Sequence, residues 1–248
     1  MSNSVVLITG ALTGIGRAAA LAFAKDGARL IVSGRKEPEG KALEAELRKL
    51  GAEAVFVKAD VRRDEEVRHL VDTAVAKFGR LDVAVNNAGT EGTPGPVVDQ
   101  TEESYKDVFD TNVLGVLLST KHELRVMTAQ KSGSIINISS RYGHAGAAGA
   151  SVYVASKHAV EGISKSAALE VAGSGVRVNV VAPGTTETGM LDRFTGNASN
   201  KAALVGSVPV GRVGTPEEIA STIVYLASKT ASYITGSVFD VDGGLAAG

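Results

Sequence analysis

Cysteine is absent from this sequence, and so is any long apolar run. Without cysteine, disulfide bonds, thiolate catalysis and cysteine-based zinc sites are excluded. No segment approaches the roughly 20 consecutive apolar residues that a membrane-spanning helix requires. The apolar run from Val5 to Ile8 also lacks the basic start of a signal peptide. We therefore expect a cytoplasmic protein without a membrane partner.

A large charge of either sign is missing too. The 26 basic and 27 acidic residues leave a formal net charge of −1 at pH 7, which gives no electrostatic reason to expect nucleic acid as a partner. No metal site is expected, because the histidines have no metal-ligand spacing; they are His69, His122, His144 and His158. No linker or repeat divides the chain, so residues 1–248 are predicted to form a single domain.

Short apolar runs alternate with amphipathic stretches along the chain. The runs are rich in Val and Ile and mostly continuous, as in strands covered on both faces; they are Val5–Thr9, Arg29–Ser33, Ala54–Lys58, Val83–Asn86, Ser134–Ser139, Arg177–Ala182 and Ser237–Val241. The helical patterns between them are Ile15–Asp26, Pro38–Leu50, Asp64–Phe78, Thr101–Ala129, Val152–Ala172 and Pro216–Ala227. This alternation predicts an α/β protein with a doubly wound parallel sheet (Rossmann fold) and helices on both faces. Such sheets bind ligands beyond the carboxyl ends of their strands.

A glycine-rich turn follows the first predicted strand. Glycine allows a tight turn and a close approach to a pyrophosphate, and the N–H groups of the helix that follows face the phosphates. The spacing is Gly-x3-Gly-x-Gly rather than the general Gly-x-Gly-x2-Gly. A structural turn would also need glycine, but the position after the first strand favours a dinucleotide site. The cofactor contacts expected here are Gly10, Thr13, Gly14, Ile15 and Gly16.

The end of the second strand indicates which nucleotide is preferred. An acid there would bind the ribose 2′-hydroxyl of NAD, whereas this sequence has Gly34, Arg35 and Lys36. A guanidinium suits a 2′-phosphate by its charge and fork geometry, although a solvated loop is the alternative. Glu37 is expected in the first turn of the next helix, where an acid favours the helix dipole. The prediction is NADP(H), with NAD(H) as the second choice.

The ends of the third and fourth predicted strands supply further candidates for cofactor contacts. Asp60 and Val61 follow the third strand and could reach the adenine. Asn87 follows the fourth strand, where it either contacts the cofactor or simply caps a turn. Ala88 and Gly89 are small enough for the ribose to pass close to the backbone.

A tyrosine and a lysine four residues apart lie in the helical pattern 152–172. The spacing brings Tyr153 and Lys157 to one helix face. A free tyrosine has a pKa of about 10, and a neighbouring ammonium lowers it. The pair alone is common by chance, but Ser140 closes the preceding strand and Asn112 lies early in the helical stretch 101–129.

Taken in order, these elements resemble the short-chain dehydrogenase/reductase family over essentially the whole chain. The matching elements are Thr9-Gly10-x3-Gly14-Ile15-Gly16, Asn86-Asn87-Ala88-Gly89, Asn112, Ser140, Tyr153-x3-Lys157, Pro183-Gly184 and Asp242-Gly243-Gly244. The resemblance implies that Tyr153 is the general acid and that Ser140 polarises the substrate carbonyl. It also implies that Lys157 binds the nicotinamide ribose and lowers the tyrosine pKa, and that Asn112 anchors a water in a proton relay.

The resemblance further implies a nicotinamide carboxamide site bordered by Pro183, Gly184, Thr186 and Thr188. Thr186 is a departure, because the family commonly has Ile or Val there. A homotetramer is expected, partly from the resemblance and partly because the segment Tyr233–Gly248 has few charges and would be poorly covered at the edge of a monomer's sheet.

The predicted reaction is NADPH-dependent reduction of a ketone or keto ester to a secondary alcohol. The pocket is expected between segments 141–152, 90–96 and the flexible stretch 185–201, in which Met190, Leu191 and Phe194 would form an apolar lid. The substrate contacts expected are Tyr142, His144 and Met190, with solvent exposure as the alternative for His144 and Tyr142. Apolar ketones are expected rather than sugars or charged metabolites. Arg141 would pair with a carboxylate if it pointed inward, but it is expected to face solvent, because an unpaired guanidinium in an apolar pocket is costly.

The alternatives are a 3-oxoacyl-carrier-protein reductase and a sugar or polyol dehydrogenase. An inactive dinucleotide-binding regulator would be expected to lose Tyr153 or Lys157, and both are present.

Overall fold

The computed structural model describes residues 3–247, and its centre is a parallel sheet. The sheet has seven strands in the order β3-β2-β1-β4-β5-β6-β7, and every neighbouring pair is parallel. The strands are β1 (Val5–Thr9), β2 (Arg29–Gly34), β3 (Ala54–Lys58), β4 (Val83–Asn86), β5 (Gly133–Ile138), β6 (Val176–Pro183) and β7 (Val238–Val241). The predicted doubly wound fold is confirmed.

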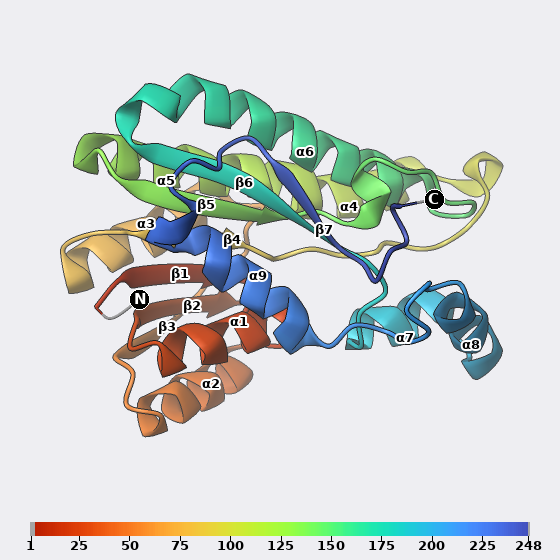
Figure 1. Ribbon diagram of the computed structural model, residues 1–248, viewed down its shortest axis with the longest axis horizontal. Coiled ribbons are helices and arrows are strands. Elements are labelled where there is room, and N and C mark those ends of the chain that lie inside the picture. Colours follow the sequence, from red (N-terminus) through yellow and green to blue (C-terminus); the bar gives the residue numbers. More distant parts are fainter. Residues whose placement is uncertain (1–2, 248) are drawn as a thin grey trace.

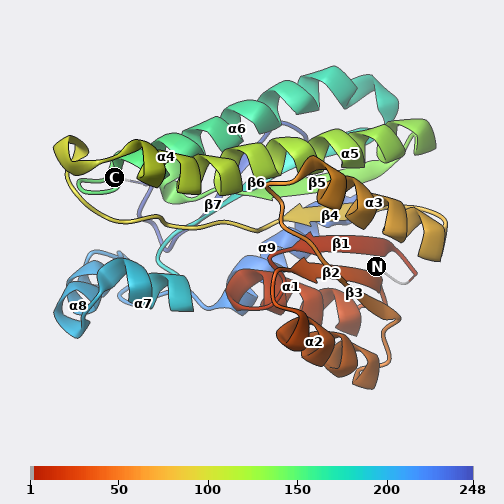
Figure 2. The same cartoon turned by 180° about the vertical axis from the view of Figure 1, so that it is seen from behind.

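Helices cover both faces of the sheet (Figures 1 and 2). On one face lie α1 (Gly14–Lys25), α2 (Glu37–Lys49) and α9 (Pro216–Ala227). On the other lie α3 (Asp64–Phe78), α4 (Glu102–Phe109), α5 (Gly115–Gln130) and α6 (Ser151–Val171). Within residues 3–247, no helix is long and apolar enough to cross a membrane.

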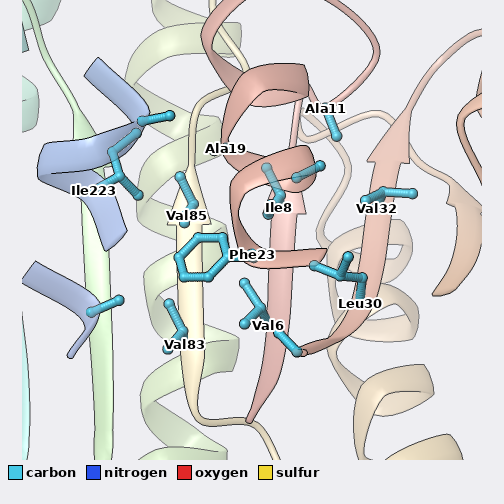
Figure 3. Packing of buried hydrophobic residues seen from close by; sticks show 14 of the residues in the cluster. Val6, Ile8, Ala11, Ala19, Phe23, Leu30, Val32, Val83, Val85 and Ile223 are labelled. Carbon is cyan, nitrogen blue, oxygen red and sulfur yellow. The ribbon is translucent and has the colours of Figure 1, made fainter. Parts of the chain in front are cut away.

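The core follows from the continuous apolar strands. Val6 and Val85 are fully buried on the α1 side of the sheet, and Figure 3 shows Phe23 of α1 packed over them. Ile223 of α9 belongs to the same cluster. A second cluster fills the opposite face and includes Leu7 and Ile135. The polar residues that follow these strands lie together at the carboxyl ends of the sheet, where a ligand can reach them.

Two segments differ from the sequence prediction. The single helix expected over 101–129 is divided by a π-helical turn, Asp110–Leu114, which separates α4 from α5. The stretch 185–201, expected to be flexible, contains α7 (Gly189–Thr195) and the start of α8 (Ala198–Gly206). These short helices project beyond the carboxyl ends of the strands (Figure 1).

A buried polar network joins the middle of the sheet to α5 and α6. Asn86 Nδ2 donates to Glu123 Oε2 and to Asn137 Oδ1, both at 2.9 Å, and Asn137 Nδ2 donates to Ser164 Oγ at 2.8 Å. Glu123 is fully buried, and its Oε1 has no hydrogen-bond partner among the described residues. Burial raises the pKa of Glu123 to about 8, so this carboxyl is neutral in the folded protein at neutral pH.

We expect Glu123→Gln to flatten the pH dependence of the unfolding free energy between the ordinary pKa of 4.5 and about 8. The unfolded chain releases this proton before the folded protein does, so wild-type stability falls as pH rises, by at most about 1.4 kcal/mol per pH unit. Glutamine cannot ionise, so the variant gains on wild type toward higher pH. Urea unfolding across this window measures the slope, with the exposed Glu170→Gln on α6 as control. Equal slopes for wild type and Glu123→Gln would contradict the prediction.

Candidate active site

The glycine-rich turn lies against the end of β4, where the strand order reverses. Gly10 and Gly14 have φ of +62° and +54°, which side chains disfavour. A Cβ on Gly10 would lie 2.7 Å from Ala88 Cα, and one on Gly16 would collide with the Gly10 carbonyl oxygen. The turn therefore requires glycine at these positions, and the backbone cradle it forms fits a dinucleotide pyrophosphate at the start of α1.

Asn87 holds this turn to the sheet. Its Nδ2 donates to the Gly10 carbonyl at 2.9 Å and the Thr9 carbonyl at 3.3 Å. The backbone N–H groups of Asn87 and Ala88 donate to Thr9 Oγ at 3.1 and 3.2 Å. Asn87 thus caps the turn, as the simpler interpretation proposed, and it also lines the cavity described below.

The candidates for the adenosine end lie apart from that cavity, at the ends of β2 and β3. Arg35 is exposed and forms no ion pair with any described residue, and Glu37 lies in the first turn of α2, as expected. Asp60 is paired with Arg62 at 2.6 Å, and this hydrogen-bonded pair lowers the pKa of Asp60 despite its partial burial. Val61 packs against Gly115 of α5. Beside Gly34, therefore, the cation Arg35 is available to a phosphate, while the carboxylate of Asp60 is already engaged.

The predicted chemical groups meet at the ends of β5 and α6. Lys157 Nζ donates to the Ile138 carbonyl at 2.9 Å and lies 5.6 Å from the centroid of the Tyr153 ring. Ser140 begins a 3₁₀ turn, and its Oγ accepts from the Tyr142 N–H at 3.2 Å. Ser140 is buried except for the part of its surface that borders the cavity.

Burial shifts the pKa values of both Tyr153 and Lys157 of α6. It raises the pKa of Tyr153 to about 12, with a hydrogen bond to Ser140 opposing the shift and Glu91 adding to it. Burial also lowers the pKa of Lys157 to about 8. The expected lowering of the tyrosine pKa is not found here, because the Lys157 ammonium points to the Ile138 carbonyl and desolvation disfavours the phenolate. A neutral phenol suits a proton donor.

Asn112 lies in the π-helical turn and clamps the loop after β4. Its Oδ1 accepts from the Thr90 N–H at 2.8 Å, while its Nδ2 donates to the Thr90 carbonyl at 2.8 Å and to Ser156 Oγ at 3.0 Å. All polar atoms of the side chain are thus in use.

A cavity of roughly 850 Å³, including its open mouth, joins the two halves of the site. Many of the predicted residues line it: Ile15, Asn87, Gly89, Ser140, Tyr142, Tyr153, Lys157, Pro183, Gly184, Thr186, Thr188 and Met190. Leu191 and Phe194, the other two residues expected in the apolar lid, also line the cavity. Glu91, Arg141 and Leu204 line it as well. The three segments expected to bound the pocket do so.

His144 and Arg141 are not where the sequence prediction placed them. His144 lies outside the cavity lining, with Nδ1 3.1 Å from Glu161 Oε1 and Nε2 3.0 Å from Asp240 Oδ1. These two carboxylates, from α6 and β7, turn the ring away from the substrate side. Arg141 was expected in solvent, but it is half-buried and lines the cavity.

The fold and this constellation define a nicotinamide-dependent oxidoreductase of carbonyl and alcohol groups. A family model described as Enoyl-(Acyl carrier protein) reductase matches residues 10–246. The chain is 42% identical to an A-factor type gamma-butyrolactone 1'-reductase of Streptomyces virginiae, over 98% of this chain and 96% of the relative. It is also 42% identical to a 3-oxoacyl-[acyl-carrier-protein] reductase of Synechocystis sp., over 99% of this chain and 98% of that relative.

The comparison with solved structures agrees with these sequence relatives. A variant of actinorhodin polyketide ketoreductase with NADPH superimposes with a TM-score of 0.94 at 36% identity, covering 99% of both chains. The chain belongs to the short-chain dehydrogenase/reductase family.

We expect Tyr153→Phe to lower kcat by about 10²- to 10⁴-fold, the usual value of a general acid, and to leave NADPH binding nearly intact. The change removes one hydroxyl and keeps the ring. NADPH consumption with a ketone that wild type reduces gives kcat, and NADPH fluorescence gives the Kd. Tyr105→Phe, on the exposed surface of α4, is the matched control. A loss below tenfold would show that another group delivers the proton.

Proposed function

We propose that this protein reduces a ketone or keto ester to a secondary alcohol and prefers NADPH. The observation that carries the proposal is the convergence of Ser140, Tyr153 and Lys157 on one wall of the cavity that continues past the glycine-rich turn. The bound nicotinamide supplies the hydride. Ser140 donates a hydrogen bond to the carbonyl oxygen, where negative charge develops, and Tyr153 delivers the proton to that oxygen.

The other residues position the cofactor in this proposal. Lys157 binds the nicotinamide ribose, and Asn112 holds the loop that carries Gly89. Pro183, Gly184, Thr186 and Thr188 would hold the carboxamide, and the glycine-rich turn would hold the pyrophosphate. Gly34 and Arg35 would receive the 2′-phosphate, and Asp60 and Val61 would border the adenine. A protein that depends on this intracellular cofactor is proposed to be cytoplasmic.

The cavity wall favours an apolar substrate body. Met190, Leu191, Phe194 and Leu204 form most of the side contributed by α7 and α8, and a sugar would need several convergent polar partners. The cations of α7 and α8 are paired with acids: Arg193 with Glu91, and Lys201 with Glu187 and Asp192. They offer no unpaired basic patch to an acidic carrier protein. A free ketone is therefore favoured over a carrier-bound one.

We expect higher kcat/KM with NADPH than with NADH, measured with acetophenone and ethyl acetoacetate and with glucose as the polar comparison. Arg35→Leu should lower kcat/KM for NADPH by about 10- to 100-fold, the value of a hydrogen bond to a charged group, and change NADH use little. Lys25→Leu, at the far end of α1, is the charge-matched control. Equal use of both cofactors by wild type would refute the preference, and better turnover of glucose would refute the substrate class.

We also propose a homotetramer. Leu117 of α5 and Leu169 of α6 are exposed on one face, and Tyr225 and Tyr233 near the edge strand β7 are exposed on another. Two separate apolar faces suit the two kinds of contact in a closed tetramer. Gly248, the end of the C-terminal segment cited from sequence, lies outside the described residues. Light scattering should report four times the 25.4 kDa chain mass, and a monomer would contradict the proposal.

A further inference from the structure

Arg141 is a cation in the cavity wall without an anionic partner. It directly follows Ser140 and lines the same cavity. Its Nε is buried and has no hydrogen-bond partner, and the side chain forms no ion pair with any described residue. A buried guanidinium nitrogen without an acceptor is costly. The two terminal nitrogens of Arg141 are not buried and donate to no described residue, so they are the donors open to a ligand that accepts hydrogen bonds.

The one acid among the described residues of the cavity lining is already engaged. Glu91 also lines the cavity, and its side chain is only 7% exposed. Arg193 of α7 holds both of its oxygens, Nε to Oε1 at 2.6 Å and a terminal nitrogen to Oε2 at 3.2 Å. The Glu91–Arg193 pair is neutral as a unit, so the charge of Arg141 remains uncompensated. The only other charged group in the cavity lining is the cation Lys157.

The contact of Arg141 with the ring of Tyr142 does not use the N–H donors of the guanidinium. The guanidinium carbon lies over the Tyr142 ring, 4.9 Å from its centroid, which is a cation–π contact. This contact takes up none of the N–H donors of the guanidinium, whose fork geometry can give a pair of hydrogen bonds to one anion.

From this geometry we infer that the substrate carries a carboxylate in addition to its ketone, and that Arg141 binds this carboxylate. The inference rests on the proposed ketone reductase function and adds the substrate class: an oxo acid with an apolar body. A guanidinium and a carboxylate match in charge and fork geometry. The ketone lies at Ser140 and Tyr153, while Met190 and Phe194 cover the carbon chain. This replaces the sequence expectation that charged substrates are excluded.

The test compares 5-oxohexanoate with its methyl ester, which has the same carbon chain but no charge. Wild type should favour the acid in kcat/KM, and Arg141→Met should lower the acid-to-ester ratio by about 10- to 100-fold, as expected for a charge-assisted pair. Most of the loss should fall on KM, because the carboxylate contact is the same before and during the reaction. Arg141→Lys should retain part of the preference. Arg68→Met on the exposed surface of α3 removes the same charge outside the cavity and should leave the ratio unchanged.

An unchanged ratio in Arg141→Met, with the ester still reduced, would overturn the role of Arg141 while the reductase function stands. If wild type reduces neither compound, the proposed function fails for this class of ketone, and binding then decides the inference. Calorimetry with NADP⁺ present compares hexanoate with hexanamide. Tighter binding of hexanoate that is lost in Arg141→Met would support the site, and equal binding of the two would refute it.

Discussion

The close approach of Gly10 to the backbone of Ala88 is the constraint on which the site depends. The two residues end neighbouring strands at the point where the strand order reverses, and no side chain fits between them. Asn87 fixes the contact with hydrogen bonds to both carbonyls of the turn. The next residue, Gly89, then lies against Asn112 and Lys157: a Cβ there would be 3.3 Å from Asn112 Oδ1 and 3.7 Å from Lys157 Nζ. One close contact thus couples the cofactor cradle to the catalytic helix.

Polar groups at this edge of the sheet are kept at a cost to stability. Burial disfavours the charged form of Lys157 and the phenolate of Tyr153, and a buried guanidinium nitrogen of Arg141 has no partner within the described chain. The two faces of the sheet are packed with apolar side chains that offset such costs. Tyr153, Lys157 and Arg141 all line one cavity, and ionisable groups with shifted pKa values in one cavity are typical of a functional site.

The strands and the site residues at their ends could be predicted from sequence for a single reason. Parallel strands buried on both faces read as continuous apolar runs, and the polar residues that follow them must meet at one edge. The π-helical turn could not be predicted, because its five residues continue a helical pattern without a break. Side-chain direction in the loop after β5 was equally inaccessible. His144 is turned outward by Glu161 and Asp240, which are distant in sequence, and Arg141 is turned inward by the ring of Tyr142.

Helices α7 and α8, which were not predicted from sequence, contribute both to the apolar wall of the cavity and to its charge balance. Their signals were present, since Thr188 and Asn197 stand at helix starts and Gly196 ends α7 with φ of +69°. Helices of seven and nine residues are not stable alone, so their order depends on contacts with the rest of the protein. One such contact is Arg193 with Glu91. The ion pair that anchors α7 over the cavity also neutralises Glu91, the one described acid in the lining of the cavity that Arg141 shares. The same interaction that positions the apolar lid therefore leaves the cavity with a net positive charge.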